Sequence, residues 1–120
     1  MIGKIYFGRV FLAFVLAAFG AAGANAECQG SSGFSYCDNV QIETVTVDGG
    51  TSNWITTTGT EANLECTPDS GTSLKIDTTG ANADWLLSTI LTAYSTKVPV
   101  FIRVNSSGQC LIYYVRLQAH

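Results

Sequence analysis

Residues 85–104 read WLLSTILTAYSTKVPVFIRV, and the spacing of the apolar residues changes within this segment. Its first part carries an apolar stripe at positions i, i+3, i+4 and i+7, which consists of Leu87, Ile90, Leu91 and Tyr94. This spacing follows the period of about 3.6 residues that is typical of an amphipathic helix. From Val98 to Val104 every second residue is a branched apolar one, as in a strand. The segment therefore predicts a helix that leads directly into a strand.

Charged residues and a proline mark the ends of this helix. Asp84 precedes the stripe, where its carboxylate can accept hydrogen bonds from free N–H groups and favour the positive helix end. Lys97 places a positive charge near the free carbonyl groups at the other end. Pro99 cannot continue the helix, because it has no N–H to donate and its ring clashes with the preceding turn. We therefore expect the helix to begin just after Asp84 and to end at Lys97.

The first 26 residues have the organisation of a secretory signal peptide. Lys4 and Arg9 form a basic start, residues 10–22 are almost continuously apolar, and Ala24-Asn25-Ala26 is a small-x-small cleavage sequence. The alternative is a transmembrane anchor, but the apolar run is shorter than the roughly 20 residues that a spanning helix needs. The sequence therefore predicts an exported protein with one mature domain, residues 27–120, and no membrane span in it.

The charge of residues 27–120 excludes two classes of partner. This part contains four basic and nine acidic residues, which gives it a net charge of −5. Nucleic-acid binding needs a basic surface, and electrostatic docking on an anionic membrane needs one as well. The length suits a single domain with a small core.

All four cysteines, Cys28, Cys37, Cys66 and Cys110, lie in the mature part. An even number of cysteines in a small exported domain predicts disulfides, and four cysteines allow three pairings. We favour a local bond between Cys28 and Cys37 and a bond between strands from Cys66 to Cys110. The alternative is a zinc site, but no C-x-x-C pair is present and the compartment favours oxidation. We expect no metal and no cofactor.

The mature part otherwise reads as strands separated by turn residues. Strands are expected at residues 40–47, 53–58, 62–66, 98–104 and 110–117, with a short extended piece at 74–77. The apolar residues of the first strand change parity near Glu43 and Thr44, which predicts a β-bulge. Residues 29–33 are polar and rich in Gly and Ser, so we expect a flexible lead-in there. Asp48-Gly49-Gly50 is a hairpin turn signal.

This element order predicts a mainly β domain with one helix. A five-stranded antiparallel barrel with its helix between strands 3 and 4 is the OB-fold arrangement. The alternative is an α+β sandwich with an open sheet. The final strand carries apolar or aromatic residues on both faces. One face should therefore meet the core and the other a neighbouring subunit, because a large exposed apolar surface usually marks a partner site.

Catalytic residues are not apparent in this sequence. The single histidine, His120, is the last residue, whereas a histidine base needs a fixed position and an orienting partner. Asp69 and Asp77 could imitate the carboxylate pair of a glycosidase, but nothing in the sequence brings them together. We expect a protein that is not an enzyme.

Several aromatic residues are candidates for binding roles. The candidates for sugar contact are Phe34, Tyr36, Trp54 and Phe101. Exposed aromatic residues beside Ser, Thr and Asn are typical of sugar binding, in which a flat ring packs on the sugar and polar groups meet its hydroxyls. Packing in the core or at an interface is the alternative. Trp85 and Phe101 lie off the expected core stripes, and Tyr114 lies on the two-faced final strand. These three residues are the expected oligomer interface.

The helix–strand unit, with Tyr94-Ser95-Thr96 followed by Val98-Pro99-Val100, resembles the corresponding segment of bacterial toxin B subunits. The resemblance is to the receptor-binding subunit of the subtilase cytotoxin and to the pertussis-like and typhoid-toxin B subunits. Phe34-Ser35 also recurs ahead of a strand at about the distance found in that family. The family has a tyrosine in the strand after the helix, where this chain has Arg103 and Val104.

The resemblance implies an exported OB-fold subunit of a homo-oligomeric ring, usually a pentamer. It implies that the ring binds glycans on host surfaces and carries an enzymatic A subunit as its partner. It also implies that Ser35 contacts the glycan, whereas Tyr36 and Trp54 are candidates on their residue type alone. The alternative function is that of a small exported structural or accessory protein that acts through protein contacts and binds no glycan.

Overall fold

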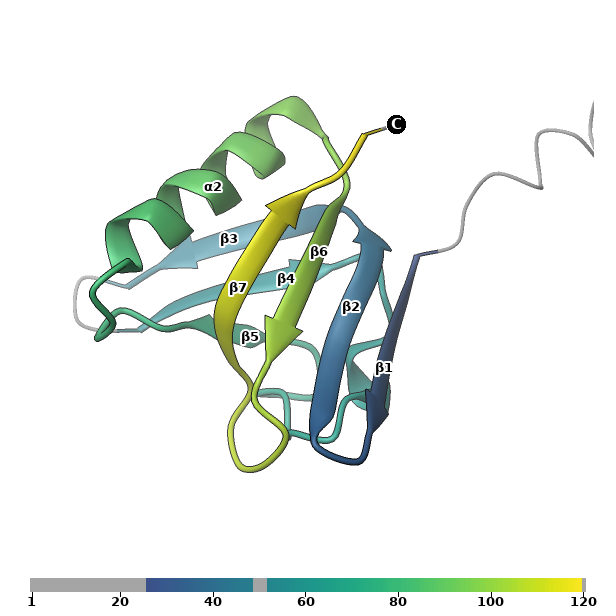
Figure 1. Cartoon of the computed structure of the whole chain (residues 1–120). Coiled ribbons are helices and arrows are strands. Elements are labelled where there is room, and N and C mark those ends of the chain that lie inside the picture. Colours follow the sequence, from purple (N-terminus) through teal and green to yellow (C-terminus); the bar gives the residue numbers. More distant parts are fainter. Residues whose placement is uncertain (1–25, 49–51, 120) are drawn as a thin grey trace, which may run out of the picture.

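The computed structural model describes residues 26–48 and 52–119 (Figure 1). The predicted signal peptide therefore lies outside the described residues, apart from Ala26, and so does the tip of the predicted turn at Asp48-Gly49-Gly50. Within the described ranges, no helix is long and apolar enough to cross a membrane.

The described residues form seven strands, one α-helix and one short 3-10 helix. In chain order they are β1 (Glu27–Ser31), β2 (Phe34–Val40), β3 (Ile42–Val47), β4 (Asn53–Thr57), η1 (Glu61–Asn63), β5 (Leu74–Ile76), α2 (Ala83–Thr96), β6 (Val100–Val104) and β7 (Leu111–Leu117). The strands pair in the order β1-β2-β6-β7-β5-β4-β3, so β1 and β3 are the edges of the sheet. β5 and β7 run parallel, whereas the other neighbouring pairs are antiparallel.

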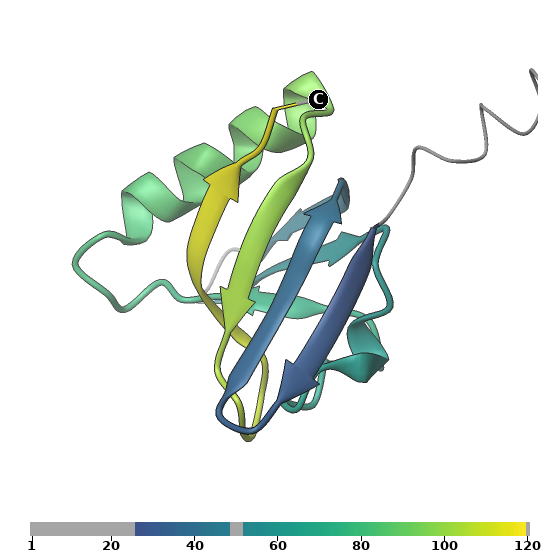
Figure 2. The same ribbon diagram turned by 45° about the vertical axis from the view of Figure 1, so that its right-hand side comes forward.

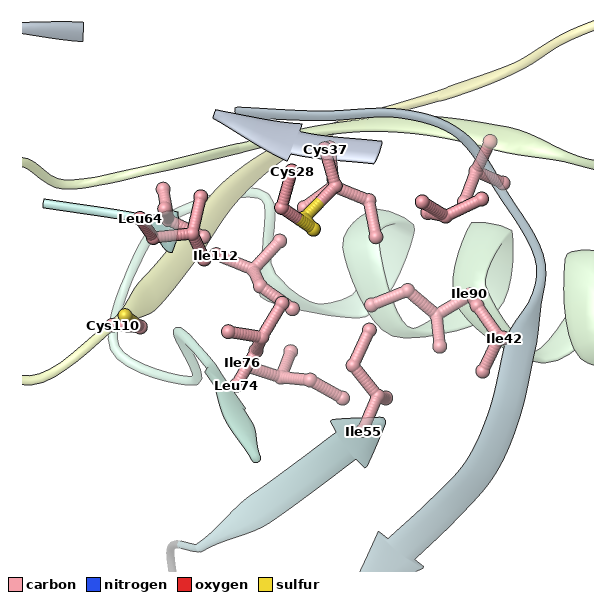
Figure 3. Packing of buried hydrophobic residues seen from close by; sticks show 14 of the residues in the cluster. Cys28, Cys37, Ile42, Ile55, Leu64, Leu74, Ile76, Ile90, Cys110 and Ile112 are labelled. Atoms are coloured by element: carbon pink, nitrogen blue, oxygen red, sulfur yellow. A yellow bond between two sulfur atoms is a disulfide. The ribbon is translucent and has the colours of Figure 1, made fainter. Parts of the chain in front are cut away.

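The sheet curls around its own core. Gln41 alone separates β2 from β3, although these two strands lie far apart in the strand order. In Figures 1 and 2, β1, β2, β6 and β7 form one half of the sheet, and β3, β4 and β5 cross behind it. Large apolar side chains fill the space between the halves, and Figure 3 shows Ile55, Leu74, Ile76 and Ile112 meeting there.

The predicted β-bulge is confirmed. The register between β3 and β4 shifts between Ile42 and Thr44, at the position where the apolar pattern changes parity. The extra residue lets Ile42 reach the core while Val45, three positions later, also packs against it. The parity change in the sequence therefore reports a real irregularity of the strand.

The helix is confirmed, but its start and its buried face differ from the prediction. Its N-cap is Asn82, and Asp84 lies in the first turn. Ile90 and Ala93 are buried, and Leu86 and Leu87 pack against the core beside them. Two residues of the predicted stripe, Leu87 and Ile90, thus face the core, whereas Leu91 is 42 % exposed and Tyr94 is 38 % exposed. The small Ala93 gives little apolar signal, yet it lets the helix approach the sheet closely.

The end of the helix matches the sequence. α2 stops at Thr96, and Lys97 adopts a left-handed conformation with φ 61°. A left-handed residue in this position is a common way for a helix to end. Pro99 follows, and β6 begins at the next residue.

Both predicted disulfides are confirmed. Cys28 and Cys37 lie directly opposite each other on β1 and β2, and they are bonded. Cys66, in the segment between η1 and β5, is bonded to Cys110, the residue before β7. All four cysteines are buried in the core. The second bond closes the longer loop, with a sequence separation of 44 residues against 9 for the first.

Three segments differ from the prediction. Residues 34–39, where we expected no strand, belong to β2. Residues 29–33 belong to the hairpin of β1 and β2, whose turn includes Gly33 at φ 78°, and do not form a flexible lead-in. Residues 62–66 form no strand. Here the Glu61 carboxylate accepts hydrogen bonds from the N–H and hydroxyl of Thr57, and this contact draws the chain into the turn of η1.

The prediction of a mainly β domain with one helix is confirmed for the described residues. In that part of the chain the sheet has seven strands of mixed direction, where we expected five antiparallel ones. α2 accordingly follows β5 and not a third strand. The parallel pair was not foreseen, because the apolar pattern of a short strand carries no information about its direction.

Candidate functional site

The outer side of one half of the sheet gathers aromatic rings and arginines. Tyr36 of β2 lies opposite Arg103 of β6, and Arg103 lies opposite Tyr114 of β7. Because strand residues alternate between two sides and Cys37 and Ile102 face the core, these side chains face outward. The set, which we call the aromatic–arginine face, consists of Phe34, Tyr36, Phe101, Arg103, Tyr114 and Arg116.

The rings of this face form a continuous row. The centroids of Phe34 and Tyr36 are 5.3 Å apart and tilted by 59°. Tyr36 and Phe101 are stacked at 5.4 Å with an angle of 19° between the rings. Phe101 meets Tyr114 edge to face at 6.2 Å. Offset and edge-to-face geometries are the favourable ones for aromatic pairs, so these ring contacts stabilise the row.

The two arginines lie against these rings. The Arg103 guanidinium carbon is 4.7 Å from the ring centroid of Phe34 and 5.2 Å from that of Tyr114. The Arg116 guanidinium carbon is 4.8 Å from the ring centroid of Phe101. Among the described residues, neither arginine forms an ion pair with a carboxylate, although the chain is acidic. Their positive charges are therefore held on the face without being neutralised there.

Polar side chains border the face on the side of β1. The Tyr36 hydroxyl donates a hydrogen bond to Oε1 of Gln29 over 3.0 Å. Nε2 of Gln29 in turn donates to Oε1 of Glu27. Nε2 of Gln118 donates to Oδ1 of Asp38. Flat rings thus lie beside amide, hydroxyl and carboxylate groups, which is the mixture that carbohydrate recognition uses.

The structure separates the three residues predicted to bind a glycan. Tyr36 belongs to the face. Ser35 is 2 % exposed, and its Oγ accepts a hydrogen bond from the N–H of Glu65 on the opposite side of β2. Ser35 is therefore not part of the face. Trp54 lies on β4, where Lys75 places its Nζ 5.7 Å from the ring centroid. Three strands stand between Trp54 and Tyr36 in the sheet order.

The three residues of the predicted interface also lie in two places. Phe101 and Tyr114 are neighbours within the aromatic–arginine face. Trp85 is 76 % exposed and lies on α2. The structure therefore brings Phe101 and Tyr114 into contact and places Trp85 on a different element.

Phe34 had been weighed from the sequence as a possible ligand contact, whereas Arg103 and Arg116 completed the face without having been selected. A signal for them exists, because Phe101 and Arg103 are two apart in one strand, and so are Tyr114 and Arg116. Residues two apart in a strand face the same side. What the sequence does not contain is the register that sets Arg103 beside Tyr114 and Phe101 beside Arg116.

A hollow adjoins this face beside β7. It has a volume of about 370 Å³, and we call it the β7 hollow. Its lining consists of Asp77, Gly80, Ala81, Asn82, Ala83, Leu86, Tyr113, Tyr114 and Val115. Tyr114 belongs both to the hollow and to the face. The N–H of Thr79, and with it the hydroxyl of Thr79, donates to Oδ1 of Asp77, and these bonds hold the pKa of that carboxyl below its ordinary value of 3.8.

A second hollow, near β3 and β4, is lined by threonines and by Glu43 and Glu61. The buried Glu61 accepts through Oε1 from Thr57 and so holds the turn that follows β4. In the described part of the chain, no group of three or more His, Cys, Asp or Glu residues is arranged to hold a metal ion. The arrangement of the aromatic–arginine face suits binding.

No family model matches this chain, and neither a curated protein nor a solved structure does. The resemblance to toxin B subunits therefore remains a hypothesis that rests on short motifs.

Proposed function

We propose that this protein is an exported, non-enzymatic binding subunit that recognises a glycan through the aromatic–arginine face. The observation that carries the proposal is the row of Phe34, Tyr36 and Phe101 beside two arginines that have no carboxylate partner among the described residues. Such a row offers flat apolar surface to a sugar ring. The arginines offer charged donors, which favour a sugar that carries an acidic group.

The proposal includes an OB-type fold and a homo-oligomer. If the bent segment of β2 and β3 is counted as one strand, then β4, β5, β6 and β7 complete five strands, and α2 falls between the third and the fourth. An open binding face gives low affinity per subunit, and several copies on one assembly raise the avidity. A ring, five-membered by the toxin resemblance, provides such copies and a platform for an enzymatic A subunit.

The proposal assigns separate surfaces to the ligand and to the neighbouring subunit. Phe101 and Tyr114 cannot be covered by a neighbour and also contact a glycan. We therefore place the subunit contact at the unpaired edges, β1 and β3, and at the exposed Trp85. Edge strands invite pairing with another chain, and head-to-tail pairing closes a ring when the rotation fits.

A glycan array probed with the mature protein, residues 27–120, tests the proposal. We expect binding to at least one class of glycan, and we expect Tyr36→Ala to remove it. Tyr94→Ala is the matched control, because it removes the same kind of side chain from an exposed position on α2. An array without signal from a correctly oxidised, assembled protein would refute the glycan ligand, and equal losses for the two variants would refute the assignment of the face.

The second candidate is an accessory protein that acts through protein contacts alone. The composition of the face favours it too, because Tyr, Phe and Arg are enriched in protein interfaces. The substitution Phe101→Asp separates the two functions. If the face is a subunit contact, light scattering should show that the oligomer dissociates. If it is a glycan site, the oligomer should persist and glycan binding should be lost.

A further inference from the structure

The β7 hollow adjoins the aromatic–arginine face at the outer edge of β7. Tyr114 meets Phe101 and Arg103 in the face, and it also lines the hollow together with Tyr113. In Figure 1 the connection between β5 and α2 passes the outer edge of β7, and Figure 2 shows the same connection from the side. A ligand that packs on the face therefore reaches the hollow without leaving the surface.

The edge of β7 at the hollow has no strand partner within the described residues. β5 pairs with β7 at Leu111 and Ile112 and ends at Ile76. Beyond Ile112, the side of β7 that faces away from β6 borders the hollow, at Tyr113, Tyr114 and Val115. The N–H of Asp77 still donates to the carbonyl oxygen of Ile112, and past this point β7 forms a wall of the hollow.

The side chains of the hollow suit a neutral sugar unit. Asp77 contributes a carboxylate that stays ionised, and Asn82 and Tyr113 add an amide and a phenol. A carboxylate accepts hydrogen bonds from sugar hydroxyls but repels an acidic group. Leu86 and Ala83 supply apolar surface. The volume of about 370 Å³ lies within the range of roughly 300–1,000 Å³ that is typical of small-molecule sites.

We infer that the β7 hollow is a second subsite, so that the ligand is an oligosaccharide of at least two consecutive units. One unit packs on the aromatic–arginine face, and the next, a neutral unit, enters the hollow and donates hydroxyl hydrogen bonds to Asp77. Tyr114 lies at the junction and contacts both units. The inference rests on the proposed function, because it assigns the length and polarity of the same ligand.

The test uses an array that carries neutral, carboxylated and sulfated glycans, each series printed in lengths from one unit upward. The wild-type mature protein should bind two-unit glycans at least tenfold more tightly than the single units, a difference of about 1.4 kcal/mol. Two variants change the hollow: Asp77→Asn removes its charge, and Ala81→Trp fills it from the exposed loop. Both should bring two-unit binding down to the single-unit level and leave single-unit binding unchanged.

Asp69→Asn is the matched control, because Asp69 is an exposed turn carboxylate that does not line the hollow. Equal binding of single units and longer glycans by the wild type would overturn the second subsite while leaving the proposed function intact. The same holds if length dependence persists in both variants, because the second unit then binds elsewhere. Absence of any glycan signal would overturn the proposed function itself and the inference with it.

Discussion

Arg103 links three rings of the aromatic–arginine face. Its guanidinium lies over Phe34, Phe101 and Tyr114, and its Nε is buried without a hydrogen-bond partner within the described residues. A planar guanidinium stacks on rings, whereas the ammonium of lysine is a compact charge. Arg103→Lys should therefore lower the free energy of unfolding by about 1 kcal/mol while keeping the net charge. Urea unfolding measures this, and Arg103→Lys with wild-type stability would contradict the stacked geometry.

Asn105 closes the loop between β6 and β7 with both ends of its side chain. Its Nδ2 donates to the carbonyl oxygens of Ser107 and Gln109, and its Oδ1 accepts from the N–H of Leu111. Asn105→Asp keeps the acceptor and removes both donors, so it should destabilise the domain by about 1–3 kcal/mol. Asn63→Asp, at an exposed position of η1, is the control and should be nearly neutral. Thermal unfolding of the two variants compares them directly.

The helix offers the sharpest test among the elements, because its buried face differs from the one that the sequence favours. Ile90 is fully buried, whereas its neighbour Leu91 is 42 % exposed. Ile90→Ala should cost about 2–5 kcal/mol through lost burial and the cavity left behind. Leu91→Ala should cost much less, because alanine is also the better helix former. If chemical denaturation gives comparable losses of unfolding free energy for the two variants, the helix is rotated so that Leu91 is also buried.

Local sequence patterns were sufficient to predict most elements, but they did not predict how distant strands pair. The helix and the bulge at Glu43 follow from the spacing of nearby residues, and the even number of cysteines predicts two disulfides. The sequence does not encode strand order in any local pattern, so the parallel pair of β5 and β7 was missed. For the same reason, the full candidate site could not be predicted from the sequence. Tyr36 was found by residue type, whereas Arg103 joins it only through the register between β2 and β6.

For the whole molecule, the two disulfides should contribute unequally to stability. The bond between Cys66 and Cys110 closes a loop with a separation of 44 residues, and the bond between Cys28 and Cys37 closes one with a separation of 9. Chain entropy alone assigns about 4 kcal/mol to the longer loop and about 3 kcal/mol to the shorter one. Replacing each pair by alanines should therefore lower the melting temperature more for Cys66 and Cys110. If calorimetry shows the larger drop in melting temperature for the Cys28 and Cys37 pair, local packing around β1 contributes more to stability than loop length does.

Ligand binding on the aromatic–arginine face, and not near Trp54, can be located by NMR. The isotope-labelled mature protein is titrated with the glycan that binds best on the array, and each backbone amide is followed. We expect the largest chemical-shift changes at residues 34–36, 101–103 and 113–116, with little change at β4. Shift changes that centre on Trp54 and Lys75 and leave Tyr36 and Phe101 unaffected would contradict this expectation.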